Sequence, residues 1–352
     1  MTFPETQRIL VNARVLSAPT TGTQRYTQEL LARWNGNTDT ISPGNYARGV
    51  SGHAWEQIIL PMKLGRRLLF SPSNSGPFQE ENQVVTIHDM AVFDCAETFS
   101  PRFAAWSRFL LPRLARRARR IITVSEFVKE RIIVLTKVSA SKIVVIPNGV
   151  ASTFCPEAVS GLPVAMDCLH LPSHNYILAA GSVELRKNLA RLLEAWARVQ
   201  GRVPEDLWLV VVGANGNSRV FAGMRFDNLP ARVFWAGHVD ESLLPSLFAG
   251  ALLLAYVSYY EGFGLPPLEA MASGTPVLAG NRSSLPEVVG DAGVLVDPFS
   301  VKEIAEAICG MVEKPALRAD LRRKGLLRAK QFSWDETARK TWNVLQSVAT
   351  PS

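Results

Sequence analysis

The feature that most constrains the fold is a regular alternation of short apolar runs with helix-like segments. The runs are apolar throughout, which indicates strands buried on both faces, as in a parallel sheet. Because helical patterns separate them, the strands predict βα units with right-handed crossovers. The strand-like runs begin at Arg8, Val84, Ile121 and Lys142 in a first series, and at Tyr176, Leu207, Val233, Ala251 and Pro276 in a second.

The alternation breaks once, between about Thr153 and Ser173, where proline, glycine and short polar stretches predict a linker. A chain of 352 residues is also too long for one ordinary core. We therefore predict an α/β protein with an N-terminal domain at residues 1–155 and a C-terminal domain at residues 173–334. Each would be a Rossmann-like, doubly wound parallel sheet, and the two would face a cleft that holds the ligands at the carboxyl ends of the strands.

Cysteine usage and the first residues bear on location. The four cysteines are scattered without close pairing, which fits a reducing cytosol. The first residues hold no long apolar run, so we expect no signal peptide. The sequence predicts a cytoplasmic protein, either free or peripheral at the inner face of the plasma membrane.

The net charge of +7 is concentrated in one segment. Ten Arg and Lys residues stand against two Glu residues between Pro101 and Ala140, and Arg113–Arg120 is the densest part. With the neighbouring Trp106 and Phe109, this segment is typical either of a helix on an anionic membrane or of a solvated helix face. No nucleic-acid-binding module is present in the sequence, so we expect no nucleic-acid partner.

One loop holds two carboxylates that packing does not explain. The stretch YYEGFGLPPLEAMASGTPVLAG follows a buried strand, places Glu261 in a loop and places Glu269 in the first turns of a helix. Free N–H groups near Gly264 and Leu265, together with the helix dipole, would form a phosphate site. Gly262 and Gly264 let the backbone approach a ligand. Ionised carboxylates accept hydrogen bonds from hydroxyl groups, so phosphate and carboxylates together predict a sugar nucleotide.

A second segment supplies the matching positive charge. In GSVELRKNLARLLEAW, Arg186 and Lys187 precede a helix at the end of a predicted strand. Two cations at such a junction would neutralise a diphosphate leaving group. The alternative is a solvated pair of surface charges.

The stretch EGFGLPPLEAMASGTPVLA resembles the paired-glutamate signature of the retaining glycosyltransferases of family 4, which share the two-domain GT-B fold. The resemblance implies that Glu261 holds sugar hydroxyls, that Glu269 holds the ribose, and that Arg186 and Lys187 hold the diphosphate. Some relatives carry an extra arginine where this chain has Ser182. The resemblance also implies that a C-terminal helix, at about 335–352, returns to the N-terminal domain.

Further positions match the family less specifically, and each keeps a structural alternative. Gly22 resembles a glycine loop near the donor phosphates, or is a plain loop glycine. His88, next to the sugar and the acceptor, and Asp89, on the acceptor side, match an HD motif, or His88 is a structural histidine. Ser125 and Asn148 either bind the donor or cap and turn the chain. His238 and Val239 match the loop whose backbone reads the nucleobase, with Phe263 and Leu265 completing the donor site, although His238 is equally a surface residue. Trp55 either stacks on an acceptor sugar or belongs to the core.

The resemblance implies transfer with retention of configuration. The sequence contains no D-x-D triplet, which argues against a metal-dependent, single-domain transferase, so we expect no metal and no cofactor beyond the nucleotide-sugar donor. The family resemblance favours a hexosyltransferase, with mannose from GDP-mannose as first choice, acting on a glycan or lipid-linked acceptor in lipopolysaccharide, capsule or exopolysaccharide synthesis. The alternatives are a UDP-sugar-dependent glucosyl or galactosyl transferase, a sugar-nucleotide hydrolase or epimerase, and a degenerate binding subunit.

Overall fold

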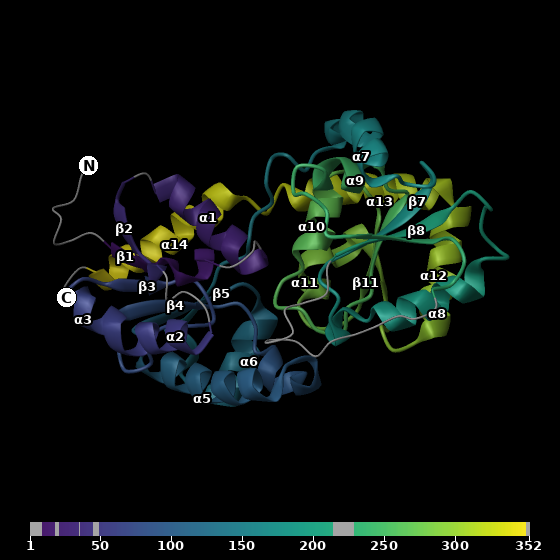
Figure 1. Cartoon of the computed structure of the whole chain (residues 1–352). Coiled ribbons are helices and arrows are strands. Elements are labelled where there is room, and N and C mark those ends of the chain that lie inside the picture. The colour runs from purple at the N-terminus through teal and green to yellow at the C-terminus, as the bar shows by residue number, and fades with distance from the viewer. Residues whose placement is uncertain (1–8, 18–20, 35, 45–48, 214–228, 350–352) are drawn as a thin grey trace. The chain divides into compact units, whose positions relative to one another are not determined.

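The computed structural model describes residues 9–17, 21–34, 36–44, 49–213 and 229–349 (Figure 1). Contacts divide the chain into two compact units. The first holds residues 1–94, 104–149 and 333–352, and the second holds residues 95–103 and 150–332. Residues 95–103 and 150–155 therefore belong with the second unit, whereas the sequence analysis placed them in the N-terminal domain.

The first unit is built on a parallel six-stranded sheet of strand order β2-β1-β3-β4-β5-β6. Its strands are β1 (Ile9–Asn12), β2 (Thr38–Ile41), β3 (Leu69–Ser71), β4 (Gln83–Ile87), β5 (Arg120–Thr123) and β6 (Ile143–Val145). Its helices are α1 (Gly22–Trp34), α2 (Gly49–Ala54), α3 (Leu60–Leu64), α4 (Ala91–Asp94), α5 (Pro101–Arg117), α6 (Glu126–Thr136) and α14 (Trp334–Ala349). A π-helical turn, η4 (Trp55–Ile59), joins α2 to α3.

The last helix, α14, packs on α1 of the first unit. The indole N–H of Trp34 donates to the carbonyl of Ala338 at 3.2 Å, and the rings of Trp34 and Trp342 lie 5.5 Å apart. A Cβ added to Gly149 would lie 2.1 Å from the backbone nitrogen of Trp334, so only glycine permits this approach. Ser333 precedes this helix, and its hydroxyl accepts from the backbone N–H of Asp335 at 3.1 Å.

The second unit holds another parallel six-stranded sheet, of order β12-β11-β10-β7-β8-β9. Its strands are β7 (Tyr176–Ala180), β8 (Trp208–Val212), β9 (Val233–Gly237), β10 (Leu253–Tyr256), β11 (Val277–Gly280) and β12 (Gly293–Val296). Its helices are α7 (Leu162–Leu169), α8 (Leu189–Val199), α9 (Leu244–Gly250), α10 (Leu265–Ala272), α11 (Leu285–Val289), α12 (Val301–Glu313) and α13 (Pro315–Ala329). Figure 1 shows α8 and α12 on one side of this sheet and α10 and α11 on the other.

Burial explains these elements. Trp196 of α8 and Ile308 of α12 are both fully buried in one apolar cluster with the strands they cover. Ser300 accepts from the backbone N–H of Glu303 at 3.2 Å and so caps the start of α12. The predicted linker is wrong in part: residues 156–169 form a 3₁₀-helix and α7, which pack against α9. Among the described residues, no helix is both long enough and apolar enough to span a bilayer.

Candidate active site

The candidate site lies at the carboxyl ends of β7 and β10, two neighbouring central strands of the second sheet whose following connections run in opposite directions. The connection after β7 leads to β8 on one side, whereas β10, the other neighbour of β7, leads to β11 on the opposite side. Ligands of doubly wound sheets bind at such a switch point, at the carboxyl ends of the strands. The loop after β7 carries Arg186 and Lys187, and the loop after β10 carries Glu261.

The loop after β7 is fixed by its own backbone and by one asparagine. Arg186 and Lys187 lie in a single 3₁₀ turn, and Asn188 follows in the left-handed conformation with φ of 60°. The buried amide of Asn188 donates to the carbonyls of Val257 at 3.0 Å and Pro298 at 2.6 Å. Asn188 therefore ties the two loops together and sets the direction of the two cations.

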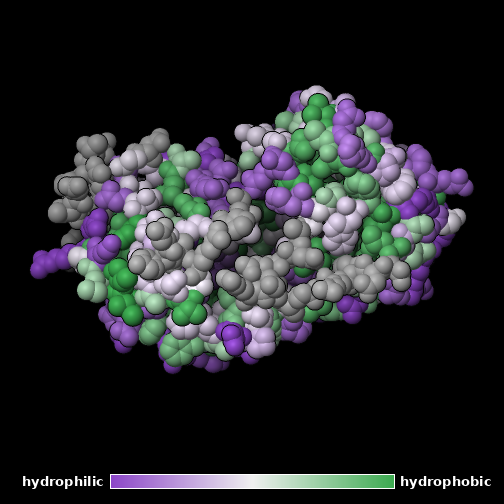
Figure 2. Space-filling model, viewed as in Figure 1, coloured by the Kyte–Doolittle hydropathy of each residue, from purple (hydrophilic) through white to green (hydrophobic). Residues whose placement is uncertain are grey.

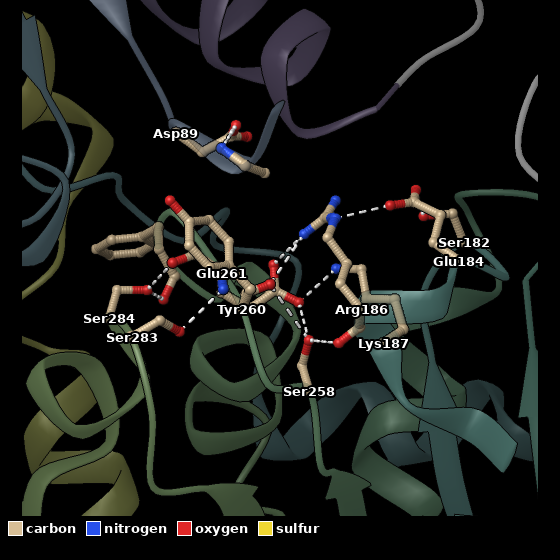
Figure 3. Close-up of polar contacts among 12 residues, drawn as sticks. Asp89, Ser182, Glu184, Arg186, Lys187, Ser258, Tyr260, Glu261, Ser283 and Ser284 are labelled. Atoms are coloured by element: carbon tan, nitrogen blue, oxygen red, sulfur yellow. Dashed lines mark hydrogen bonds and ion pairs between the residues drawn. The ribbon is translucent and has the colours of Figure 1, made fainter. Parts of the chain in front are cut away.

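Arg186 and Lys187 converge on the carboxylate of Glu261, as Figure 3 shows. Nη1 of Arg186 lies 3.0 Å from one oxygen, and Nζ of Lys187 lies 2.7 Å from the other. The hydroxyls of Tyr256 and Ser258 donate to that second oxygen, each at 2.7 Å. The Glu261 side chain is 7% exposed, so both ion pairs are shielded from bulk water.

These contacts fix the charge of Glu261. Burial by itself would raise the pKa of the carboxyl, but Lys187, Arg186 and the hydrogen bond from Ser258 outweigh it and lower the pKa to about 2. The pKa of Tyr256 is raised well above its usual value, by burial and by the neighbouring negative charge of Glu261. At neutral pH the site thus holds an ionised carboxylate, a neutral phenol and two cations.

The structure adds Glu184, which the sequence analysis did not select. Its carboxylate lies 2.8 Å from Nε of Arg186, its side chain is 3% exposed, and it accepts a hydrogen bond from Ser182. The guanidinium is therefore held from two sides, by Glu184 through Nε and by Glu261 through Nη1 (Figure 3). The only sequence signal was a glutamate two residues before the arginine, which is a weak pattern.

Replacing Glu184 by glutamine should weaken the expected sugar transfer about tenfold, because Arg186 loses one of its two charged partners and is positioned less precisely. A positioning role predicts a larger loss in kcat than in KM for the donor, measured by steady-state kinetics. The matched control is Glu194→Gln on α8, where the carboxylate is exposed and pairs with Arg198 on the same helix. Equal kinetics for Glu184→Gln and wild type would contradict this role.

The loop from Glu261 to Gly264 is held in place by hydrogen bonds from the loop that follows the neighbouring strand β11. That second loop supplies Ser283, which accepts from the backbone N–H of Glu261 at 2.9 Å, and Ser284, which donates to the carbonyls of Glu261 at 3.0 Å and Phe263 at 2.7 Å. Three neighbouring strands therefore position one carboxylate. Neither serine was selected from the sequence.

Gly264 is needed where the loop becomes α10. Its φ is 117°, and an added Cβ would lie 2.9 Å from a methyl of Leu285. We expect Gly264→Ala to lower the free energy of unfolding by about 1–3 kcal/mol through backbone strain, measured by urea denaturation. Gly310→Ala in α12 is the control. Nothing lies within 4 Å of its added Cβ, so that variant should be about 0.5–1 kcal/mol more stable. Equal stability of both variants would contradict the strain.

The start of α10 keeps the two backbone donors predicted near Gly264 and Leu265, and the next three residues add none. Positions 266 and 267 are prolines without N–H groups, and the N–H of Leu268 is bonded to the carbonyl of Gly264 at 3.3 Å. Within the described residues, the N–H groups of Gly264 and Leu265 remain without a partner. Because these two N–H groups carry only partial positive charge, the side chains of Arg186 and Lys187 supply most of the positive charge near this loop.

The remaining predicted donor residues of the second unit lie at separate points. Glu269 is buried in the second turn of α10, and Gly262 and Phe263 are buried in the loop before it. After β9, His238 is exposed and Val239 is buried. Because β9 is the edge strand, β8 lies between it and β7, the strand that precedes Arg186. A small open pocket borders Lys187 between Gly181, Ser182 and Tyr256.

In the first unit, His88 and Asp89 follow β4. Nε2 of His88 lies 2.8 Å from the carbonyl of Pro72, so this nitrogen carries the proton and donates. Burial lowers the pKa of His88, although that hydrogen bond and the charge of Asp89 act in the opposite direction. The ring is therefore neutral at pH 7. The side chain of Asp89 accepts a hydrogen bond from the N–H of Ala91, the first residue of α4, at 3.0 Å.

The other predicted residues of the first unit have local roles. Trp55 is 4% exposed and packs in a core cluster with Leu10 and Leu60, so its assignment to the acceptor is wrong: its ring has no face free for a sugar. Ser125 accepts from the N–H of Val128 at 3.2 Å and caps α6. Gly22 is exposed in the first turn of α1. Asn148 is 5% exposed, and its side-chain oxygen has no partner among the described residues.

A polar cluster that no sequence motif indicates lies at the switch point of the first sheet, between β1 and β3. Glu56, 1% exposed, accepts from Asn12 at 2.8 Å, pairs with Arg14 at 3.0 Å and binds Ser75. Isolated asparagine, arginine and glutamate residues gave no spacing signal. The fold brings them together from a strand, a helix and a loop.

Two family models match the chain. One, described as "Glycosyl transferases group 1", matches residues 170–328, and the other, "Glycosyltransferase Family 4", matches residues 79–154. The chain is 33% identical over 269 residues to O-antigen chain mannosyltransferase B of Escherichia coli, which covers 76% of this chain and 71% of that protein. It is 28% identical over 265 residues to O-antigen chain mannosyltransferase RfbU of Salmonella typhimurium, covering 74% and 69%.

The fold also matches known structures. Sucrose-phosphate synthase from Thermosynechococcus elongatus superposes with a TM-score of 0.73 at 20% identity, over 97% of this chain and 98% of that one. At this identity the likeness shows the fold alone, which is the two-sheet GT-B architecture expected from the sequence. A switch-point site with paired cations and a buried glutamate, two matching family models and a 33% identical relative agree: the chain belongs to the glycosyltransferases of family 4.

Proposed function

We propose that this enzyme transfers mannose from GDP-mannose, with retention of configuration, to a glycan or lipid-linked acceptor in the synthesis of a bacterial surface polysaccharide. The single observation that carries the proposal is the convergence of Arg186 and Lys187 on Glu261 at the switch point. The relatives named as O-antigen mannosyltransferases support the choice of sugar and acceptor class.

The diphosphate of the donor is proposed to lie against Arg186 and Lys187. In the transfer step, the bond between the anomeric carbon and the diphosphate oxygen breaks, and negative charge grows on that oxygen. Two cations held in advance stabilise this charge more in the transition state than in the ground state, which is what accelerates the reaction. The start of α10 adds the N–H groups of Gly264 and Leu265.

The new bond is proposed to form on the face from which the diphosphate leaves. The acceptor hydroxyl oxygen attacks the anomeric carbon, and its proton passes to a phosphate oxygen of the departing diphosphate. This step accounts for both bonds and for the proton without a nucleophile from the protein. Glu261 then serves as an acceptor for sugar hydroxyls and as the counter-ion of both cations, and Glu269 serves as the acceptor for the ribose.

The acceptor side is proposed to use the carboxyl edge of the first sheet. Neutral His88 donates from Nε2 to Pro72, so its Nδ1 is the atom that can accept a hydrogen bond from a hydroxyl. Asp89 stands next to it and is retained as an acceptor-side residue. With no metal in the proposal, a chelator should leave the rate of transfer unchanged.

The proposal is tested by thermal shift and by product analysis. GDP-mannose and GDP should raise the melting temperature, because a ligand that binds the native state stabilises it. The product with a glycan acceptor should keep the anomeric configuration of the donor, read by NMR. If only UDP-sugars raised the melting temperature, the donor would be a UDP-sugar and not GDP-mannose. Release of free sugar or a changed sugar without an acceptor would indicate a hydrolase or an epimerase, and no response to any donor would indicate a binding subunit.

A further inference from the structure

An amphipathic helix of the first unit leaves one apolar side uncovered. From Gly49 to Leu64 the chain runs without a break through α2, the π-helical turn and α3. Val50, Ile58 and Met62 are 86%, 63% and 81% exposed, and Ala54 is exposed between them. The four residues are four positions apart, which places them on one face, and the wider π turn limits their angular drift. We call them the α2–α3 stripe.

The opposite face of this helix is buried against the rest of the first unit. Trp55, Leu60 and Leu64 are buried in the core under β1 and β3. Glu56 is buried in its ion pair with Arg14. Rotating the helix to bury the stripe would break this pair and expose the tryptophan, so the stripe is held at the surface.

The apolar surface continues from the stripe onto α5. His53 of α2 accepts from the indole N–H of Trp106 at 3.1 Å, which joins the two helices. Phe109 is 40% exposed and stacks on Trp106, with ring centroids 5.8 Å apart. The guanidinium of Arg113 lies 3.7 Å from the ring of Phe109. Figure 2 shows hydrophobic residues at the surface over the region where Figure 1 labels α2 and α3.

Two positive charges, unpaired among the described residues, lie at the C-terminal end of this surface. Lys63 and Arg66 are exposed beside the C-terminal end of the stripe, and no described carboxylate pairs with either. The one acid of the helix, Glu56, is buried. A second copy of the chain would bring like charges together in a two-fold contact, whereas an anionic surface would complement them.

We propose that the α2–α3 stripe, with Phe109, inserts into the surface of an anionic lipid bilayer while Lys63, Arg66 and Arg113 contact its headgroups. The contact differs from the one expected at Arg113–Arg120. There the apolar residues Leu114, Ala115 and Ala118 are buried, so that segment offers charge without an apolar face. The inference extends the proposed lipid-linked acceptor, but its test needs no sugar donor, so either idea can fail alone.

The test is co-sedimentation of the full chain with vesicles of phosphatidylcholine, with or without phosphatidylglycerol. The wild type should bind the anionic vesicles. The double variant Ile58→Ser, Met62→Ser should bind at least about tenfold more weakly, because two apolar side chains no longer leave water. Lys63→Gln and Arg66→Gln should each weaken binding about fivefold at low salt and much less at high salt.

The matched control is Val134→Ser on α6, which removes a 50% exposed apolar side chain elsewhere on the same unit. It should bind vesicles as the wild type does, and all variants should melt at the wild-type temperature because the replaced groups are exposed. Absence of wild-type binding to anionic vesicles would overturn the proposal. Equal vesicle binding by the Ile58→Ser, Met62→Ser variant and the wild type would also overturn it. So would sedimentation velocity showing that the stripe controls self-association while no vesicle binding occurs.

Discussion

Replacing Lys187 by methionine should lower kcat for sugar transfer by about 100- to 1000-fold, the usual effect of removing one preorganised group that meets transition-state charge. Methionine keeps most of the apolar stem but removes the ammonium group that lies 2.7 Å from Glu261. Glu261 keeps Arg186, Tyr256 and Ser258 as partners, so the fold should persist. Steady-state kinetics with the donor and a glycan acceptor measures the effect.

The control for this variant is Lys302→Met, on an exposed position of α12. It removes the same charge from the same unit, and its kcat should equal that of the wild type. If both variants lost activity equally, a general loss of positive charge would explain the result. If Lys187→Met kept full activity, Lys187 would have no part in the reaction.

Replacing Glu261 by glutamine should make stability less dependent on pH. The carboxyl has a folded-state pKa of about 2 against an ordinary value of 4.5, so its ionised form stabilises the fold above pH 4.5, and this contribution is lost as pH falls through about 2. The difference corresponds to about 3 kcal/mol. Urea denaturation should show the advantage of the wild type over Glu261→Gln shrinking as the pH is lowered.

An exposed carboxylate gives the matched control. Hydrogen bonds from Arg339, the largest cause, also lower the pKa of Glu336 to about 2, but this pair is at the surface of α14. Solvent screens such pairs, so Glu336→Gln should follow the stability of the wild type closely at every pH. A parallel pH dependence of wild type and Glu261→Gln would show that the buried carboxylate is not held ionised by Lys187 and Arg186.

Most strands were predictable because they are continuously apolar, and three were missed for definite reasons. The strand β2 reads TDTI and is only half-buried at the edge of its sheet, so it has neither an apolar run nor a clear alternation. The strand β3 reads LFS and has no β-branched residue, whereas the equally short β6 reads IVV and was predicted. The strand β12 begins at a glycine and is also an edge strand. The strand order, and with it the switch point, depends on long-range pairing that local patterns do not contain.

The candidate site was predictable only where a motif carries it. Glu261, Arg186 and Lys187 stand in recognisable segments at the ends of predicted strands, and the fold brings them into contact. Glu184 contacts Arg186 and Ser182, each two positions away, and Ser284 binds backbone carbonyls in another loop. Neither set of contacts leaves a specific spacing pattern in the sequence. Trp55 shows the reverse: an aromatic residue in a plausible segment belongs to the core, and only burial decides that.

The central claim is that Arg186 and Lys187, held by Glu261, bind the diphosphate of the donor. Titration calorimetry of GDP and GMP with the wild type and Lys187→Met tests it most directly, because the two nucleotides differ by one phosphate and the two proteins by one charge. We predict that the wild type binds GDP much more tightly than GMP, and that Lys187→Met loses most of this preference. An unchanged preference for GDP in Lys187→Met would contradict the claim.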